Sequence, residues 1–354
     1  MRIPTQNNKT MSENNLAKAR CAVIILNWNG ASLLRRFLPS VVRNTENSVG
    51  RVIVADNGST DDSIAVLESE FPTVEVWKMP ENYGFAGGYN RCVERASRDG
   101  YEYALLLNSD VETPAGWLSP LVDYLDSHTD VAAAQPKILS VDNTGCFEYA
   151  GAAGGYIDRN GYPYCRGRIF GTCETDRGQY DDVADIFWAT GAALLVRVDT
   201  YMAVGGLDEK FFAHMEEIDL CWRILLTGKR IVAVPDSRVY HLGGGSLPAS
   251  NPRKTYLNFR NNLLLLHKNL PDATRRRKLL KRRLLDTIAW LKFVLTLQFG
   301  NAAAVFRAHR HFAKMQRGYT SHPDVDLLDA RNDCRHNILT SYYLKGRHLF
   351  SDLG

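Results

Sequence analysis

The chain has 354 residues, enough for one large α/β domain with additions or for two ordinary domains. With 45% hydrophobic and 23% charged residues, its composition is that of a globular protein, which excludes disorder or a collagen-like repeat over most of its length. The formal net charge of +4 is too small to indicate nucleic-acid binding by itself.

The charge is unevenly distributed along the chain. Residues 251–354 contain 20 Lys and Arg against 7 Asp and Glu, whereas residues 1–250 contain 23 against 32. A basic tail that follows an acidic body favours contact of the tail with an anionic surface.

The sequence gives little indication of a redox motif, a signal peptide or a membrane span. The seven cysteines include no CxxC pair, which argues against a zinc ribbon or a thioredoxin-like site and fits a reducing cytosol. Residues 1–20 are polar, unlike a signal peptide, and we expect them to be flexible. The apolar stretch 284–305 is a poor membrane span, since polar residues interrupt it at Asp286, Lys292, Gln298 and Asn301. We therefore expect a cytoplasmic protein.

Strands and helices alternate over the first third of the chain. Apolar runs predict strands at 21–26, 51–55, 74–77 and 103–107. Helical spacing or a plausible N-cap predicts helices at 31–42, 60–70 and 85–97. This alternation predicts a parallel sheet with right-handed crossovers. The ligand site of such a sheet lies outside the carboxyl ends of its strands.

The rest of the chain has a different pattern. The Gly- and Tyr-rich stretch 145–170 predicts loops and a hairpin. Further strands are predicted at 187–197 and 230–234, and a helix at 216–226. From residue 254 onward the pattern indicates two or three helices.

Polar residues follow the first two predicted strands. Asn27 and Asn29 follow the first, and Asp56 ends the second. A carboxylate at position 56 can accept a hydrogen bond from a uracil or thymine ring or from a ribose hydroxyl. An Asx turn that only caps the loop explains Asp56 about equally well.

The stretch from Asn82 to Asn90 is rich in glycine and opens a predicted helix. Its glycines, Gly84 among them, permit close backbone approach, and the helix start offers free N–H groups to a phosphate. Taken alone, the stretch is explained slightly better as a plain Gly-rich helix entry.

Two acidic clusters follow. Asp110, in the sequence Asn108-Ser109-Asp110 after a buried strand, is placed to hold a divalent cation, although a single acid at a strand end is common. Glu216, Glu217 and Asp219 are three carboxylates within four residues, which repel one another unless a cation is near. At a helix start they are also good dipole partners. The apolar pair Phe211 and Phe212 before them favours partial burial and a carboxylate that serves as a base.

Taken in order, several segments resemble a bacterial family 2 glycosyltransferase of GT-A fold, in particular its rhamnosyltransferase-like branch. They are ILNWNG, VADNGSTDDS, ENYGFAGGYN, LLLNSD, WATGAALLVRV, GGLDEKFFAHMEEIDLCWR and the following His241, within about residues 22–271. The resemblance implies a Rossmann-like, mostly parallel central sheet with flanking helices. We expect a domain at 21–250, with a nucleotide-sugar half at 21–112 and an acceptor half at 113–250, and a basic helical region at 251–354.

On the donor side, the resemblance implies that Asp56 reads the nucleotide base, with Asn27 and Asn29 in the same pocket. Asn82, Gly84 and Asn90 resemble the segment that covers the diphosphate and the donor sugar. Asp110 and His241 resemble the metal ligands, for Mg²⁺ or Mn²⁺. Asn108 takes the first place of the family's DxD element and is at best a weak neutral ligand.

On the acceptor side, Trp188 and Gly191 resemble the strand that walls the acceptor site. Glu217 takes the place of the family's general base, where the family has Asp, and Glu216 or Asp219 are further candidates. A single displacement with one base inverts the anomeric carbon.

The implied activity is transfer of a sugar from a UDP- or dTDP-sugar, dTDP-rhamnose among them, to a hydroxyl of a saccharide or lipid-linked saccharide in cell-surface polysaccharide synthesis. One alternative is a nucleotide-sugar-binding relative without turnover, which loss of the base and metal positions would favour. A nucleotidyltransferase would need a Gly-rich, basic phosphate loop after the first strand, and a nicotinamide dehydrogenase its own fingerprint. The chain has neither.

The segment 275–283 contains seven cations in nine residues and precedes an apolar stretch. One interpretation is a helix packed on the body with a solvated face. The other is a helix on the inner face of the cytoplasmic membrane, where each cation near anionic lipid is worth roughly 1 kcal/mol. Nucleic acid is the least favoured partner, because no aromatic platform or recognition motif accompanies the cations.

Overall fold

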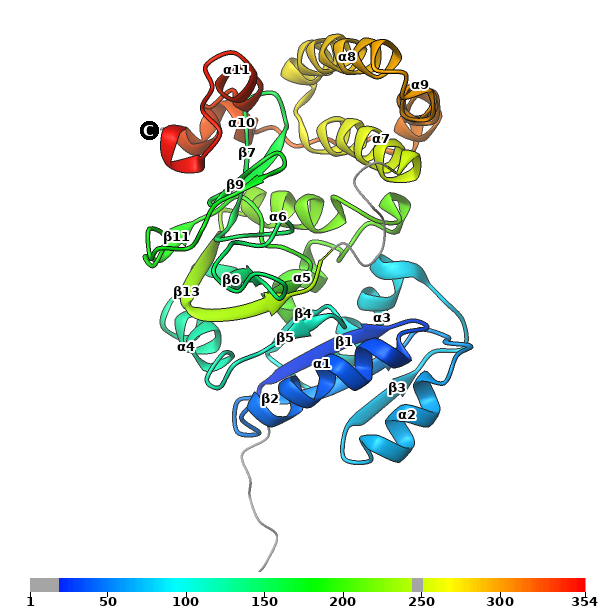
Figure 1. The fold of residues 1–354 in the computed structure, drawn as a ribbon, viewed down its shortest axis with the longest axis vertical. Helices are drawn as coiled ribbons and strands as arrows, with labels where there is room; N and C mark the ends of the chain where they lie inside the picture. Colours follow the sequence, from blue (N-terminus) through cyan, green and yellow to red (C-terminus); the bar gives the residue numbers. More distant parts are fainter. Residues whose placement is uncertain (1–18, 244–250, 354) are drawn as a thin grey trace, which may run out of the picture.

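The structure is a computed structural model that describes residues 19–243 and 251–353. Residues 1–18 of the segment predicted to be flexible lie outside the described residues. Over the described ranges the chain forms a nine-stranded sheet, a four-stranded sheet and flanking helices (Figure 1). The predicted α/β fold with a mostly parallel central sheet and C-terminal helices is confirmed.

The first third of the chain alternates between strands and helices as predicted. Its elements are β1 (Cys21–Asn27), α1 (Ala31–Asn44), β2 (Gly50–Asp56), α2 (Ser63–Glu70), β3 (Glu75–Lys78), α3 (Gly84–Arg98) and β4 (Tyr103–Leu107). β1 pairs in parallel with β2 and β4, and β2 pairs in parallel with β3. Because these strands run the same way, their carboxyl ends meet at one edge of the sheet.

The other side of the large sheet is mixed in direction. Its elements are β5 (Val111–Glu112), α4 (Ser119–Ser127), β6 (Val131–Ser140), β11 (Ala184–Asp185), β12 (Ala193–Arg197), α5 (Val198–Ala203), α6 (Glu216–Leu226) and β13 (Arg230–His241). The order of the main path is β11-β13-β6-β12-β4-β1-β2-β3, with β5 paired to β13. β12 runs antiparallel to both of its neighbours.

The predicted strand at 187–197 was wrong for its first six residues. Trp188 instead forms an isolated bridge with Gly155 of the smaller sheet. The amide of Ala193 donates to the carbonyl of Thr190 (3.2 Å), so a turn precedes β12. The apolar run therefore covers two structural contexts, which hydrophobicity alone does not distinguish.

Alternate residues of β1 contribute to separate hydrophobic clusters, as the two-residue period of a strand requires. Ala22 and Ile24 share a cluster with residues of α3 and α6, whereas Val23 and Ile25 share one with residues of α1 and α4. Both clusters are buried, and the residues of β1 from Cys21 to Ile25 are 0–2% exposed. The sheet edge is thus held on a core that is packed from both sides.

The predicted hairpin region forms the smaller sheet. Its strands are β7 (Gly155–Ile157), β8 (Pro163–Cys165), β9 (Arg168–Ile169) and β10 (Thr172–Cys173). They are antiparallel and pair in chain order.

The described C-terminal residues 251–353 are helical, as predicted, although they form five α-helices where two or three were predicted. These helices are α7 (Pro252–Asn269), α8 (Asp272–Leu295), α9 (Phe299–Met315), α10 (Leu327–Ala330) and α11 (Ile338–Tyr343). They lie at the opposite end of the molecule from β1–β3 (Figure 1). None of the helices within residues 19–243 and 251–353 is both long and apolar enough to cross a membrane. The proposed domain boundary near residue 250 stays a prediction.

Candidate active site

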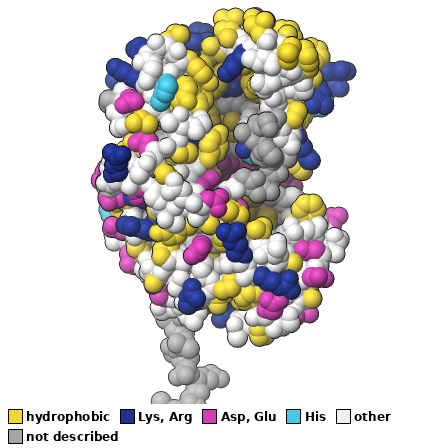
Figure 2. Space-filling view, in the orientation of Figure 1, with side chains coloured by type: hydrophobic (Ala, Val, Ile, Leu, Met, Phe, Trp, Pro, Cys, Tyr) yellow, Lys and Arg dark blue, Asp and Glu magenta, His cyan; other side chains and the backbone are white. Residues whose placement is uncertain are grey.

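A cavity of about 1660 Å³ joins the sheet edge to the C-terminal helices. Figure 2 shows the surface hollowed between the two ends of the molecule. Polar residues of several elements line it, among them Asn57, Asn82, Gly84, Asn108, Asp110, Glu216, Glu217 and His241. Residues from the first sheet edge, from the turn after β4, from α6 and from β13 are thereby brought to one space.

Asp56 ends β2 and is only 3% exposed. Its Oδ1 accepts from Asn27 Nδ2 (3.2 Å), and its Oδ2 accepts from the amide of Ser59 (3.1 Å). Asn29 Oδ1 accepts from the amides of Thr60 (2.7 Å) and Asp61 (3.3 Å). The loops after β1 and β2 are thus tied together, and the local turn weighed for Asp56 is present in the structure.

Asn82 and Gly84 lie beside a residue not singled out from the sequence. Asn57 Nδ2 donates to Asn82 Oδ1 (3.0 Å) and to the carbonyl of Gly84 (3.0 Å). Asn57 Oδ1 accepts from the amide of Tyr83 (3.0 Å). Gly84 has a φ of +70°, a conformation that glycine adopts without a steric cost. The entry to α3 is therefore fixed against the loop after β2, on the wall of the cavity.

Asp110 and His241 are adjacent because β13 pairs with β5. His241 lies opposite Val111 in that pairing, and the amide of Leu242 donates to the carbonyl of Asp110 (3.1 Å). His241 Nε2 lies 3.1 Å from Asp110 Oδ1, and Asn108 Nδ2 lies 3.3 Å from the same nitrogen.

Glu148 is a second acid beside this histidine. Its Oε2 lies 3.0 Å from His241 Nδ1. Burial alone lowers the pKa of His241, but hydrogen bonds with Asp110 and Glu148 outweigh it and raise that pKa to about 9. Burial opposes ionisation of Asp110 too, yet the hydrogen bond with His241 lowers its pKa. Sequence reasoning missed Glu148, because it lies outside the segments that carried the resemblance.

Glu216 and Glu217 begin α6 and line the cavity. Glu216 is buried and Glu217 is half-buried, and the Oε2 atom of each is buried without a hydrogen-bond partner among the described residues. Burial, with the neighbouring charge of Glu217, raises the pKa of Glu216 well above its usual value. Burial raises the pKa of Glu217 to about 7. A carboxylate with such a pKa is suited to proton transfer near neutral pH.

The loop before these acids has an unusual backbone. Phe212, His214 and Met215 have φ values of 68°, 68° and 72°, which non-glycine residues rarely adopt. Asn261 of α7 holds the loop, since its Nδ2 donates to the carbonyls of Phe211 (3.0 Å), Ala213 (2.8 Å) and His214 (2.7 Å). The C-terminal region thus helps to set the direction of the cavity acids.

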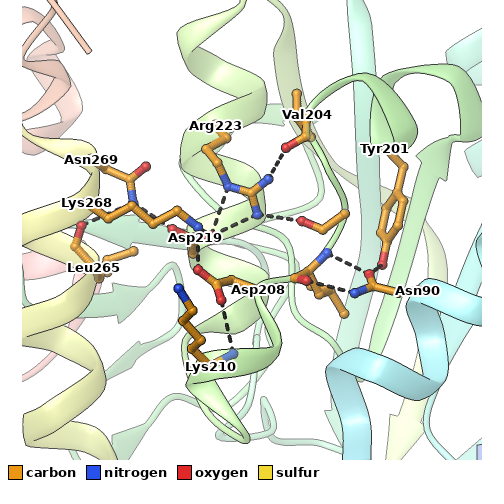
Figure 3. A network of polar contacts seen from close by, with 12 residues as sticks. Asn90, Tyr201, Val204, Asp208, Lys210, Asp219, Arg223, Leu265, Lys268 and Asn269 are labelled. Atoms are coloured by element: carbon orange, nitrogen blue, oxygen red, sulfur yellow. Dashed lines mark hydrogen bonds and ion pairs between the residues drawn. The ribbon is translucent and has the colours of Figure 1, made fainter. Parts of the chain in front are cut away.

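Asp219 is the third acid of α6 and does not belong to the cavity lining. Its carboxylate is fully buried and bonded to Arg223, Lys268 and Asn269 at 2.8–2.9 Å. Figure 3 shows this network, in which Lys268 also contacts Asp208 (2.8 Å). The structure therefore places Asp219 as a link between α6 and α7, apart from the two other acids.

The remaining site residues fall into two groups. Asn90 does not line the cavity, because its amide bonds to Tyr201 and Leu207 and joins α3 to the segment after α5. Trp188 and Gly191 do line it, and Trp188 Nε1 donates to the carbonyl of Tyr156 (2.9 Å). A Cβ added at Gly191 would lie 3.2 Å from Phe85 and 3.9 Å from Glu217, so glycine leaves space beside that acid.

The first part of the chain matches a known sequence family. Residues 22–167 match the model of the family described as Glycosyl transferase family 2. The N-acetylglucosaminyl-diphospho-decaprenol L-rhamnosyltransferase of Mycobacterium tuberculosis is 28% identical over 232 residues, which cover 62% of this chain and 75% of that protein. The O-antigen biosynthesis protein RfbC of Myxococcus xanthus is 26% identical over 227 residues, which cover 63% of this chain but only 17% of that protein.

Solved structures agree in fold. GalNAc-T7 with UDP, GalNAc and Mn²⁺ superposes with a TM-score of 0.56 at 17% identity, over 74% of this chain and about half of that one (49%). S. aureus TarS 1-349 in complex with UDP-GlcNAc gives a TM-score of 0.55 at 16% identity, over 83% and 81% of the two chains. At these identities the likeness shows the fold alone, which is that of the GT-A glycosyltransferases. Residues 22–167 therefore match the family 2 glycosyl transferase model, in a chain that has the GT-A fold.

Proposed function

We propose that the chain is an inverting, metal-dependent glycosyltransferase that uses a nucleoside-diphosphate sugar. The observation that carries the proposal is Glu217, which lines the same cavity as Asp110 and His241 and has a buried carboxylate oxygen without a hydrogen-bond partner among the described residues. Buried acids without partners are costly to a fold, and they are typical of sites where a charge or a proton is handled.

The Asp110–His241 pair fits a divalent cation. Within residues 19–243 and 251–353, no three His, Cys, Asp or Glu side chains form a metal-binding group, so these two would need further ligands from substrate or water. In the structure His241 Nε2 contacts Asp110 Oδ1 at 3.1 Å, and both atoms would be free to hold the ion once the imidazole has lost its proton. A carboxylate with an imidazole suits Mn²⁺ slightly better than Mg²⁺.

In the reaction, the acceptor hydroxyl attacks the anomeric carbon of the donor while its proton moves to Glu217. The bond between that carbon and the diphosphate oxygen breaks, and the nucleoside diphosphate leaves with the electron pair. A bound divalent ion would neutralise the charge that grows on this leaving group. One displacement without an enzyme nucleophile inverts the anomeric centre.

We further infer that Asp56 selects a pyrimidine nucleotide. It ends β2 at the sheet edge, where Asn27 and the Ser59 amide fix its carboxylate. A fixed acceptor there fits the N3–H of a uracil or thymine ring or a ribose hydroxyl. The name of the M. tuberculosis relative favours a rhamnosyl donor and a lipid-linked acceptor.

Helix α8 supports peripheral binding to an anionic membrane surface. Exposed cations at Arg276, Lys281 and Arg283 accompany exposed apolar side chains such as Leu284 and Leu291. In Figure 2, hydrophobic side chains gather over this end of the molecule. Flotation with vesicles of anionic lipid should recover the protein at low salt and lose most of it near about 0.5 M salt, because salt screens the attraction. An absence of binding at every salt concentration would favour a helix that only packs on the body.

A donor screen tests the activity. Purified protein is mixed with Mn²⁺ or Mg²⁺, a saccharide or lipid-linked acceptor, and a panel of UDP-, dTDP- and GDP-sugars, with release of nucleoside diphosphate as the readout. We expect release with one UDP- or dTDP-sugar that depends on the acceptor. Tight nucleotide binding without release from any donor would instead support a nucleotide-sugar-binding protein without turnover.

A further inference from the structure

The cavity continues well beyond the residues that the proposed reaction uses. Its lining includes an apolar group contributed by the smaller sheet and by the C-terminal helices: Tyr162, Phe170, Phe259, Leu285, Ile288 and Phe293. α8 and α11 lie at one end of the molecule, β1 and β2 at the other, and α6 between them (Figure 1). The acids of α6 thus have the sheet edge on one side and an apolar wall on the other.

Helix α8 contributes one continuous stripe to this wall. Leu285, Ile288, Ala289 and Phe293 all line the cavity, and their spacing puts them on one face of a helix. At 1.5 Å per residue this stripe is about 12 Å long. An adjacent set on the same helix is open to solvent, with Leu284 63% and Leu295 73% exposed. The apolar wall therefore continues onto an apolar outer surface.

The lining also carries positive charge. Lys292 is exposed one residue before Phe293, whereas the charge of the buried Arg282 is already paired with Asp286. Arg253, at the start of α7, lines the same cavity. Phosphate groups are the natural partners of cations placed beside an apolar wall. A free saccharide would leave this apolar wall wet, whereas a hydrocarbon chain with a phosphate linker would cover it.

We propose that the end of the cavity between α8 and α11 binds the hydrocarbon chain of a lipid-linked acceptor. The acceptor sugar would then face Glu217, its phosphate linker would lie among the cations, and the rest of its chain would pass over α8 to the bilayer. This proposal rests on the proposed function, because the sugar end of the same molecule must reach the base.

Direct binding measurements test the end of the cavity between α8 and α11 without requiring turnover. Farnesyl diphosphate and inorganic diphosphate serve as probes in calorimetry, with UDP present to fill the donor side. The parent should bind farnesyl diphosphate more tightly than inorganic diphosphate. Leu285→Gln should weaken farnesyl diphosphate binding about tenfold or more, since it places a polar group against the chain, and should leave inorganic diphosphate unaffected. Leu284→Gln is the matched control, because Leu284 is exposed and does not line the cavity.

Phe293→Gln changes the same apolar wall and serves as a second variant in case Leu285→Gln does not fold. Thermal unfolding shows whether each variant is folded. Equal affinity of the parent for the two probes would overturn the proposal. Equal losses of farnesyl diphosphate affinity in Leu284→Gln and Leu285→Gln would overturn it too. Failure of the proposed function would be seen separately, as a lack of UDP and dTDP binding or of transfer from any donor. The farnesyl diphosphate result does not depend on either.

Discussion

Helix α6 carries acids in two contrasting surroundings. On one face, Asp219 is buried and bonded to Arg223, Lys268 and Asn269. On the cavity face, Glu216 and Glu217 each have a buried carboxylate oxygen without a partner among the described residues, and burial raises the pKa of both. The paired acid contributes to holding the helix in place, whereas the unpaired acids weaken the fold at neutral pH and are available for chemistry.

The same division extends to the loop before α6. Its backbone takes rarely populated conformations at Phe212, His214 and Met215, and Asn261 holds it from α7. Strain and unpaired acids thus occur together on the cavity side, and the bonds that compensate for them come from the C-terminal helices. Such a trade of stability for function is expected where acids serve the reaction.

Loss of the metal ligands should have the largest effect. Asp110→Ala removes one of the two residues that would hold the ion, so transfer should be abolished, and EDTA should have the same effect on the parent. Coupled detection of nucleoside diphosphate release, with Mn²⁺ added back as the control, measures both. Full activity of the variant in EDTA would remove the metal from the mechanism.

Glu217→Gln keeps the shape of the side chain but cannot accept a proton. Turnover should fall by roughly 10²–10⁴-fold. Affinity for the nucleotide sugar should change little, because we place the base on the acceptor side. Glu216→Gln is the matched control and should be milder. If Glu217→Gln turns over normally while Glu216→Gln is dead, the base is Glu216.

Stability measurements separate the two faces of α6. Asp219→Ala leaves Lys268 and Arg223 without their buried partner and should lower the free energy of unfolding by about 3–5 kcal/mol. Glu217→Gln should raise it at pH 8 by about 1–3 kcal/mol, because it removes a carboxylate whose folded-state pKa of about 7 exceeds its unfolded value. Urea titrations of both variants check this. If both substitutions lowered the free energy of unfolding equally, Asp219 and Glu217 would not differ in their contribution to stability.

The raised pKa of Glu217 also predicts how the free energy of unfolding changes with pH. Since the folded protein binds this proton more tightly than the unfolded chain, the contribution of Glu217 is favourable below its unfolded pKa and is lost as the pH rises to about 7. The parent should therefore lose this contribution between about pH 4 and pH 7, whereas Glu217→Gln should not.

Asp56→Ala should have a smaller effect, confined to nucleotide binding. Loss of a charge-assisted hydrogen bond should weaken binding of UDP or dTDP by about 1.5–3 kcal/mol, roughly 10- to 150-fold. Calorimetry with UDP, dTDP and GDP measures the affinity and its preference for pyrimidines. Unchanged affinity would leave Asp56 as a local cap for the Ser59 amide only.

Most of the fold could be predicted from the sequence, because β1, β2, β4 and α6 are continuous apolar runs or clear helical patterns. β12 could not be placed so well, since the apolar run at 187–197 crosses from a bridge with the smaller sheet into the large sheet. Local periodicity contains no information on such long-range pairing.

The candidate site was predicted in part for the same reason. Asp110, His241 and Glu217 line one cavity. They were chosen from the sequence because the motifs that contain them occur along the chain in the same order as in the family. Glu148 and Asn261 were missed, because they reach the site through pairings that only the folded chain creates. Asp219 and Asn90 were included as candidates, yet the structure uses both as links between elements.

The dependence of the rate on pH tests most directly whether the unpaired acid of α6 is the base. With its pKa raised to about 7, Glu217 is protonated at lower pH and cannot take the acceptor proton. For the parent, kcat/KM should fall about tenfold for each pH unit below that value and level off above it. The residual activity of Glu217→Gln should lack this limb. A flat profile for the parent between about pH 5.5 and 8.5, or the same limb in Glu217→Gln, would contradict the assignment of Glu217 as the base.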